Sequence, residues 1–285
     1  MAVLGGGKGH GAVSVLHALG AGYGCSIGID LSTRVQLRDA PVKRKPEDSH
    51  GLLPAVVTAW QEAGLTMPEA EELFWAVRSD LPIGRGIKSS SALSIAAIHA
   101  LMEATETELE NHQKVDIAAN AQLAAECSLT GSVDDNWASL EAGWKVVDPS
   151  QPAANGILLE GEVPDIDDWT VLVIDRGPRE NPPDPERFQL AAQQFQLAIQ
   201  AIEAGNLFNA MIQNGRAVAT ATGDALGRKV CNEVGVWGCR TATISGSGPA
   251  VVAVVPKGLD TTTNRVKQFM EKRDYTVTET KFYSE

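Results

Sequence analysis

Leu81-Pro-Ile-Gly-Arg-Gly-Ile-Lys-Ser-Ser-Ser-Ala-Leu93 is the stretch of sequence that decides the fold. It begins with a proline and two glycines, and it continues into the unbroken helix-forming run 94–103. Glycines let the main chain approach a ligand closely, and the free N–H groups at a helix start favour an anion, most naturally a phosphate. Arg85 and Lys88 add positive charge at the same place. The stretch therefore predicts a phosphate-binding loop, with an ordinary loop capped by serine as the alternative.

The composition is that of a globular chain with a strongly negative charge. The 285 residues are 44% hydrophobic and 21% charged, enough for one large domain or two of ordinary size. The formal net charge of −12 argues against nucleic acid or an anionic membrane as a partner. A basic loop in so acidic a protein is a local exception, as binding sites often are.

No targeting, membrane-spanning or zinc-binding pattern stands out. No apolar run reaches the roughly 18 residues that a membrane span needs, and the N-terminus lacks the pattern of a signal peptide. The four cysteines form no Cys-x-x-Cys pair and the five histidines no His-x-x-x-His pair. We therefore expect a cytoplasmic protein without a zinc site.

The hydrophobic pattern predicts strands and helices in no regular βαβ order, which favours an α+β fold. Composition places a domain boundary at the proline-rich turn Asp148–Pro152, giving domains 1–150 and 151–285. We expect helices at 12–19, 52–63, 90–103, 115–127, 186–204, 207–222, 225–235 and 262–273. We expect strands at 25–31, 33–38, 73–78, 144–148, 156–160, 169–174 and 276–282, and a strand, glycine turn and second strand over 241–255.

Two common phosphate-loop motifs fit poorly. A P-loop requires lysine directly after its second glycine, but Ile87 separates Gly86 from Lys88. A dinucleotide fingerprint can be placed on Gly7, Gly9 and Ala12, but only three residues before it can form the required strand. A dehydrogenase is therefore a remote alternative.

A third motif fits. Pro82-x-x-x-Gly86-Ile-Lys-Ser-Ser-Ser-Ala92 resembles the central motif of the GHMP kinases, which usually reads Pro-x-x-x-Gly-Leu-Gly-Ser-Ser-Ala. The lysine at 88 and the third serine depart from that pattern and resemble the archaeal-type shikimate kinase branch. The segments 9–19 with 24–31, 129–136 and 245–250 resemble the other motifs of this branch and lie in the expected order.

The resemblance implies a two-lobed fold with the active site between the lobes. Residues 1–150 would form a ribosomal-S5-like ATP-binding lobe and residues 151–285 a ferredoxin-like α/β sandwich lobe. The implied reaction is transfer of the ATP γ-phosphate, with Mg²⁺, to the shikimate 3-hydroxyl, giving shikimate 3-phosphate for chorismate and aromatic amino acid biosynthesis. Homoserine kinase or another small-molecule GHMP kinase is the first alternative, although homoserine kinases generally lack an aspartate at the position of Asp134. A non-catalytic GHMP-fold ligand-binding protein is the second.

The same resemblance assigns roles to residues. Asp134 is the expected catalytic base, with Lys8 as a candidate lysine beside it, while Ser90 and Glu126 are the expected Mg²⁺ ligands. Asp135 and the Ser245-Gly246-Ser247-Gly248 turn are expected to face the substrate. A substrate carboxylate calls for an arginine, and Arg176, Arg179, Arg216 and Arg240 all remain candidates. The expected ATP-binding residues are Pro82, Ile83, Gly84, Arg85, Gly86, Ile87, Lys88, Ser89, Ser90, Ser91 and Ala92.

Overall fold

Two long antiparallel strands form the longest ladder of the first sheet in the computed structural model, which describes residues 2–179 and 182–284. β2 (Gly24–Arg38) pairs with β1 (Val3–Leu16) along one edge. Along its other edge β2 pairs with β3 (Phe74–Ser79) and with β4 (Trp144–Val147). β5 (Ile157–Gly161) pairs with β4 and extends this sheet beyond residue 150. The division at 150 stays a prediction.

The glycine-rich N-terminus is a strand because a helix packs directly on it. A Cβ atom added at Gly5, Gly7 or Gly9 would overlap carbonyl oxygens of α3 (Ser89–Thr105), so only glycine allows this contact. The expected helix at 12–19 is wrong: β1 continues to Leu16, and only the short α1 (Ala18–Ala21) is helical. Residues 9–16 are all buried, and a strand buried on both faces loses the alternation that distinguishes it from a helix.

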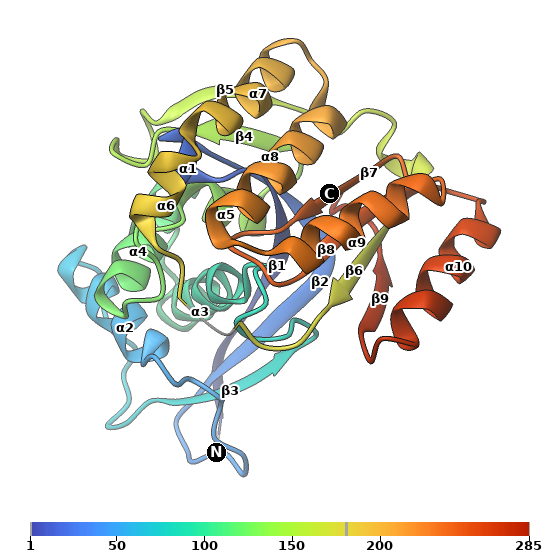
Figure 1. The fold of residues 1–285 in the computed structure, drawn as a ribbon. Helices are drawn as coiled ribbons and strands as arrows, with labels where there is room; N and C mark the ends of the chain where they lie inside the picture. The colour runs from blue at the N-terminus through green and yellow to red at the C-terminus, as the bar shows by residue number, and fades with distance from the viewer. Residues whose placement is uncertain (1, 180–181, 285) are drawn as a thin grey trace.

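The second sheet has the strand order β7-β8-β6-β9, and each pair of neighbouring strands runs antiparallel. In chain order the elements are strand, helices, strand, strand, helix and strand, the arrangement of a ferredoxin-like unit. Figure 1 shows α10 packed at the outer side of this half, next to β9. The strands are β6 (Trp169–Asp175), β7 (Thr241–Ile244), β8 (Val251–Pro256) and β9 (Thr276–Thr280). The expected α+β fold is confirmed.

Helices cover both sheets and enclose the cores. The first half contains α2 (Leu52–Glu62), α3, α4 (Asn111–Ala124) and α5 (Val133–Leu140), with the 3-10 helix η1 (Ile166–Asp168) just before β6. The second contains α6 (Pro185–Leu190), α7 (Ala192–Glu203), α8 (Leu207–Thr222), α9 (Ala225–Val236) and α10 (Asp260–Glu271). Among the residues that the structure describes, no helix combines the length and the apolar character needed to cross a membrane.

Candidate active site

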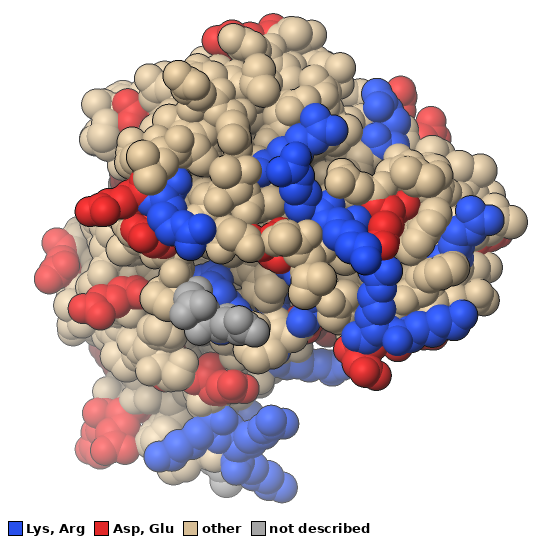
Figure 2. All heavy atoms as spheres, in the orientation of Figure 1, with Lys and Arg blue, Asp and Glu red and all other residues tan. Residues whose placement is uncertain are grey.

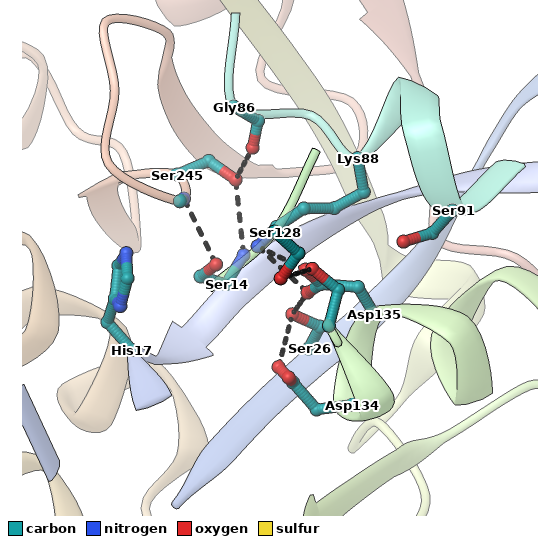
Figure 3. A network of polar contacts seen from close by, with 12 residues as sticks. Ser14, His17, Ser26, Gly86, Lys88, Ser91, Ser128, Asp134, Asp135 and Ser245 are labelled. Atoms are coloured by element: carbon teal, nitrogen blue, oxygen red, sulfur yellow. Dashed lines mark hydrogen bonds and ion pairs between the residues drawn. The ribbon is translucent and has the colours of Figure 1, made fainter. Parts of the chain in front are cut away.

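A cleft of about 460 Å³ opens where the predicted phosphate loop meets α5 and the turn between β7 and β8. These three segments lie far apart in the sequence, and Figure 3 shows them side by side. The predicted site residues that line the cleft are Ile83, Gly84, Gly86, Lys88, Ser89, Ser90, Glu126, Asp134, Asp135, Gly246 and Ser247. Eleven of the predicted residues therefore come together at one surface.

The phosphate loop has the backbone that the sequence indicated. Gly84, Gly86 and Lys88 all have positive φ angles, of 70°, 88° and 62°, and α3 begins immediately afterwards. The first N–H groups of α3 have no acceptor within the helix, so they can bind an anion in the cleft. Ser89 and Ser90 lie at this helix end.

The other loop residues anchor the loop instead of lining the cleft. Ile87 and Ala92 are fully buried in the core, as is the side chain of Ser91 between helices. Arg85 points to the second half, where its Nε lies 3.0 Å from Asp175 Oδ1. Pro82 starts the loop but does not line the cleft. The prediction that all eleven loop residues contact the nucleotide stays untested, and the geometry gives these five a supporting position.

The turn between β7 and β8 is fastened to the phosphate loop and to β1. Ser245 Oγ donates to the Gly86 carbonyl at 2.7 Å and accepts from the Ser14 N–H at 3.2 Å. Gly246 N–H in turn donates to Ser14 Oγ at 3.0 Å (Figure 3). A side chain at Gly86 would overlap the Ser245 carbonyl, so glycine is required for this close approach. Ser245 thus holds the two halves together, while its neighbours Gly246 and Ser247 face the cleft and Gly248 does not line it.

The two predicted aspartates occupy the first turn of α5 and are both buried. Lys88 Nζ lies 2.8 Å from Asp135 Oδ1, which ties the phosphate loop to α5. Ser26 Oγ lies 2.7 Å from Asp135 Oδ1 and 3.1 Å from Asp134 Oδ2. Since a serine hydroxyl carries one proton, it can donate to only one of the two carboxylates at a time.

The environments of the two aspartates differ, and the difference suits acid–base chemistry. Burial, followed by the negative charge of Asp135, raises the pKa of Asp134 well above the usual range of an aspartate carboxyl. The Lys88 ammonium and the Ser26 hydroxyl oppose this rise only in part. A carboxylate with a raised pKa is a stronger base, and Asp135 holds the neighbouring cation in place. Asp134 therefore has the surroundings of a general base.

His17 forms part of the cleft wall, which the sequence motifs did not reveal. Its Nδ1 accepts from the Leu19 N–H at 3.3 Å, so the ring proton sits on Nε2, which donates to Ser247 Oγ at 2.9 Å. Burial lowers the pKa of His17 to about 3, and the nearby charge of Lys88 acts in the same direction. The ring is therefore neutral and fixes the Ser247 hydroxyl. His17 lies in the segment 9–19 that resembles a family motif, but that resemblance assigned the residue no role.

Arg179 is the one of the four candidate arginines that lines this cleft. One guanidinium nitrogen donates to the Gly248 carbonyl at 2.7 Å, and burial lowers the pKa of the side chain. Arg176 instead pairs with Asp224. Arg216 and Arg240 lie at a different groove. The fold thus distinguishes Arg179 from the other three arginines, which the sequence alone could not do.

Lys8 does not reach the cleft. It is exposed on β1 and pairs in register with Arg34, whereas Ser14, six residues further along the same strand, pairs with Ser26 beside the aspartates. Six strand residues span about 20 Å. The structure therefore separates Lys8 from Asp134, and Lys88 supplies the cation next to the aspartate pair.

The predicted metal ligands both line the cleft. Glu126 follows α4 with a φ of 52°, and Ser90 starts α3. No group of three His, Cys, Asp or Glu side chains in the described part of the chain could hold a metal ion. A serine hydroxyl, a carboxylate and phosphate oxygens are hard donors of the kind that Mg²⁺ prefers, and Mg²⁺ commonly binds with few protein ligands. The residues present fit a magnesium ion that arrives with a nucleotide.

One family model and several known proteins resemble this chain in sequence. Residues 54–143 match the family model of the GHMP kinases N terminal domain. The chain is 29% identical over 256 residues to the "Shikimate kinase" of Methanothrix thermoacetophila, an alignment that covers 86% of this chain and 83% of that protein. It is 28% identical over 153 residues to the "Shikimate kinase" of Pyrococcus abyssi, covering 50% of this chain and 55% of the relative. The second alignment thus spans about half of the relative's length.

The fold is shared with a solved kinase. The mevalonate kinase of Methanococcus jannaschii superposes with a TM-score of 0.75 at 12% identity, covering 98% of each chain. At such low identity this likeness shows the fold alone. Residues 54–143 thus resemble the N-terminal domain of the GHMP kinases, the sequence relatives extend a resemblance to kinases over most of the chain, and the fold is that of a solved GHMP kinase.

Proposed function

We propose that this chain is an ATP- and Mg²⁺-dependent kinase that phosphorylates a hydroxyl group of shikimate. The observation that carries the proposal is the meeting of a phosphate-binding helix start, the Lys88–Asp135 ion pair and the buried Asp134 in one cleft. Phosphoryl transfer needs charge neutralisation at the transferred group and a residue that orients or deprotonates the attacking hydroxyl. The cleft contains groups suited to both tasks.

The nucleotide phosphates would lie against the phosphate loop. Main-chain N–H groups of Ser89 and Ser90 and the positive end of α3 would bind their oxygens, and the Lys88 ammonium would neutralise part of their charge. Ser90 and Glu126 would hold Mg²⁺, which bound there would supply further charge neutralisation to the phosphates. Ser245 keeps the loop in position through its bond to the Gly86 carbonyl.

Asp134 would act on the acceptor. Its raised pKa makes it a stronger base than an ordinary aspartate, so it can take the proton of the substrate hydroxyl as that oxygen attacks the γ-phosphorus. The bond from the γ-phosphorus to the bridging oxygen breaks, and ADP leaves with that oxygen. Asp135 keeps Lys88 near the reacting oxygens. One phosphoryl group thus moves from ATP to the acceptor oxygen, and one proton moves from that oxygen to Asp134.

The names of the sequence relatives and the residues of the cleft support shikimate as the acceptor. Shikimate is a carboxylate with three hydroxyl groups, and the cleft offers the Arg179 guanidinium for the carboxylate. The neutral His17, the Ser247 hydroxyl and Asp135 can bind hydroxyl groups. We assign the phosphorylated position to the 3-hydroxyl, in line with the expected product shikimate 3-phosphate.

A coupled assay of ADP release tests the proposal. Purified protein with ATP and Mg²⁺ should release ADP with shikimate and much less with homoserine or mevalonate at equal concentration, and NMR of the product should place phosphate on the 3-oxygen. ADP release with homoserine alone would replace shikimate by the other substrate. No ADP release with any acceptor, together with saturable ATP binding, would favour a non-catalytic ligand-binding protein.

A further inference from the structure

A second groove lies in the C-terminal half, away from the cleft described above. It has a volume of about 430 Å³, within the range of small-molecule sites, and lies between α8, α9 and the start of β7. It shares no lining residue with the nucleotide cleft. Three exposed arginines line it: Arg216 on α8, Arg228 on α9, and Arg240 directly before β7.

These arginines have no acidic partner. Among the residues that the structure describes, no carboxylate lies within ion-pair distance of Arg216, Arg228 or Arg240. Arg240 instead lies over the Phe208 ring, with its guanidinium carbon 5.4 Å from the ring centre, a contact that holds it in place. Figure 2 shows Lys and Arg side chains gathered in a band across the face that α8 and α9 present.

Such a cluster contrasts with the overall charge of the chain. The chain carries a formal net charge of −12, so acidic partners are plentiful elsewhere. Three guanidinium groups around one groove repel one another unless an anion lies between them. Guanidinium groups bind carboxylate and phosphate oxygens in pairs, and the amide of Asn232 on the same rim adds a further donor.

The inner wall of the groove is largely uncharged. Ile212, Ala242, Cys231 and Cys239 line it beneath the arginines. A ligand that fills the groove would therefore place an apolar body against these residues and its anionic groups against the rim. We propose that this groove is a second ligand site, which binds a small organic anion with carboxylate or phosphate groups.

Two probes distinguish the anionic groups. Citrate carries only carboxylates, whereas phenyl phosphate combines a phosphate with an apolar ring. Isothermal titration of the metal-free protein should show saturable binding of at least one probe. In protein labelled with ¹⁵N at arginine, the Nε–H signals of Arg216, Arg228 and Arg240, assigned from single glutamine variants, should shift on titration.

Matched variants test the location. Removing the three rim charges in R216Q/R228Q/R240Q should weaken binding about tenfold or more, because each lost guanidinium removes charge-assisted hydrogen bonds. The control K257Q/R265Q/K272Q removes three exposed charges of the same half outside the groove and should bind as the unaltered protein does. The proposal would be overturned if neither probe binds, or if both variants lose binding equally. NMR shifts confined to Arg85 and Arg179 would also overturn it. None of these outcomes depends on kinase activity.

Discussion

Lys88 Nζ lies 2.8 Å from one Asp135 carboxylate oxygen and 2.9 Å from the other, so a single ion pair joins the start of α3 to the start of α5. Both side chains are largely buried, with 13% and 8% of their surfaces exposed. Lys88 is also the residue that departs from the usual glycine of the family motif. Its φ of 62° is the left-handed conformation that a glycine would adopt easily, so the ion pair accompanies an unfavourable backbone angle.

Removing one partner of this pair should destabilise the protein strongly. Lys88→Met leaves the Asp135 carboxylate buried without its cation, and we expect a loss of about 3–5 kcal/mol in the free energy of unfolding. Asp135→Asn in the Lys88→Met background removes the unpaired charge and should restore most of that loss. Urea unfolding of the two single variants and the double variant measures the coupling. If the double variant loses the sum of the two single losses, the pair contributes no coupling energy.

Asp134→Asn should abolish most of the turnover without unfolding the cleft. The amide keeps the shape of the side chain and can still accept the Ser26 hydroxyl, but it cannot take a proton. We expect kcat to fall about 10²–10⁴-fold while ATP binding changes little. In the unaltered protein, kcat/KM should rise with pH on an acidic limb well above pH 4, because burial raises the pKa of this base. Near-normal turnover in the variant would exclude Asp134 as the base.

The same residue should make stability depend on pH. The folded-state pKa of Asp134 is raised, so the folded protein binds a proton that the unfolded chain has already released. The resulting contribution to stability is complete below the unfolded pKa of about 4 and is lost as pH rises through the folded pKa. The unaltered protein should therefore lose stability relative to Asp134→Asn with increasing pH, by up to about 1.4 kcal/mol per pH unit. Urea unfolding of both proteins at several pH values measures this difference and cancels the contributions of other groups. A constant difference between pH 4 and pH 9 would contradict it.

The sequence carried the local chemistry of the site but not its assembly. The types and spacing of residues such as Gly86 and Lys88 predicted a phosphate loop, and both residues have the positive φ angles of a tight loop in the structure. Asp134 was recognisable from its turn motif. The ferredoxin-like second lobe was expected from the family resemblance, and the strand order β7-β8-β6-β9 agrees with that expectation.

The remaining features depend on contacts between segments far apart in the chain. Lys8 and Lys88 both lie in glycine-rich segments, and only the length of β1 shows that Lys8 lies too far from the cleft. Arg179 was one of four equivalent arginines until the fold placed it beside Gly248. A helix was predicted at 12–19, although β1 continues to Leu16, because burial on both faces removed the alternation of the strand.

Gly24 is a further residue whose role follows from such a contact, and it yields the sharpest test of the position of Asp134. A Cβ atom at Gly24 would overlap the carboxyl group of Asp134, so this strand glycine provides the space in which the proposed base lies. Gly24→Ala should push the carboxyl group out of position and lower kcat about 10²-fold, with a smaller effect on the KM for ATP because the phosphate loop is untouched.

The matched control is Gly6→Ala in the neighbouring strand of the same sheet, where the added Cβ would meet its nearest atoms at an ordinary 3.6 Å. The control should keep its turnover, and steady-state kinetics with far-UV circular dichroism separates a local displacement from unfolding. If Gly24→Ala is folded and fully active, the reaction does not require Asp134 at the place where the structure puts it.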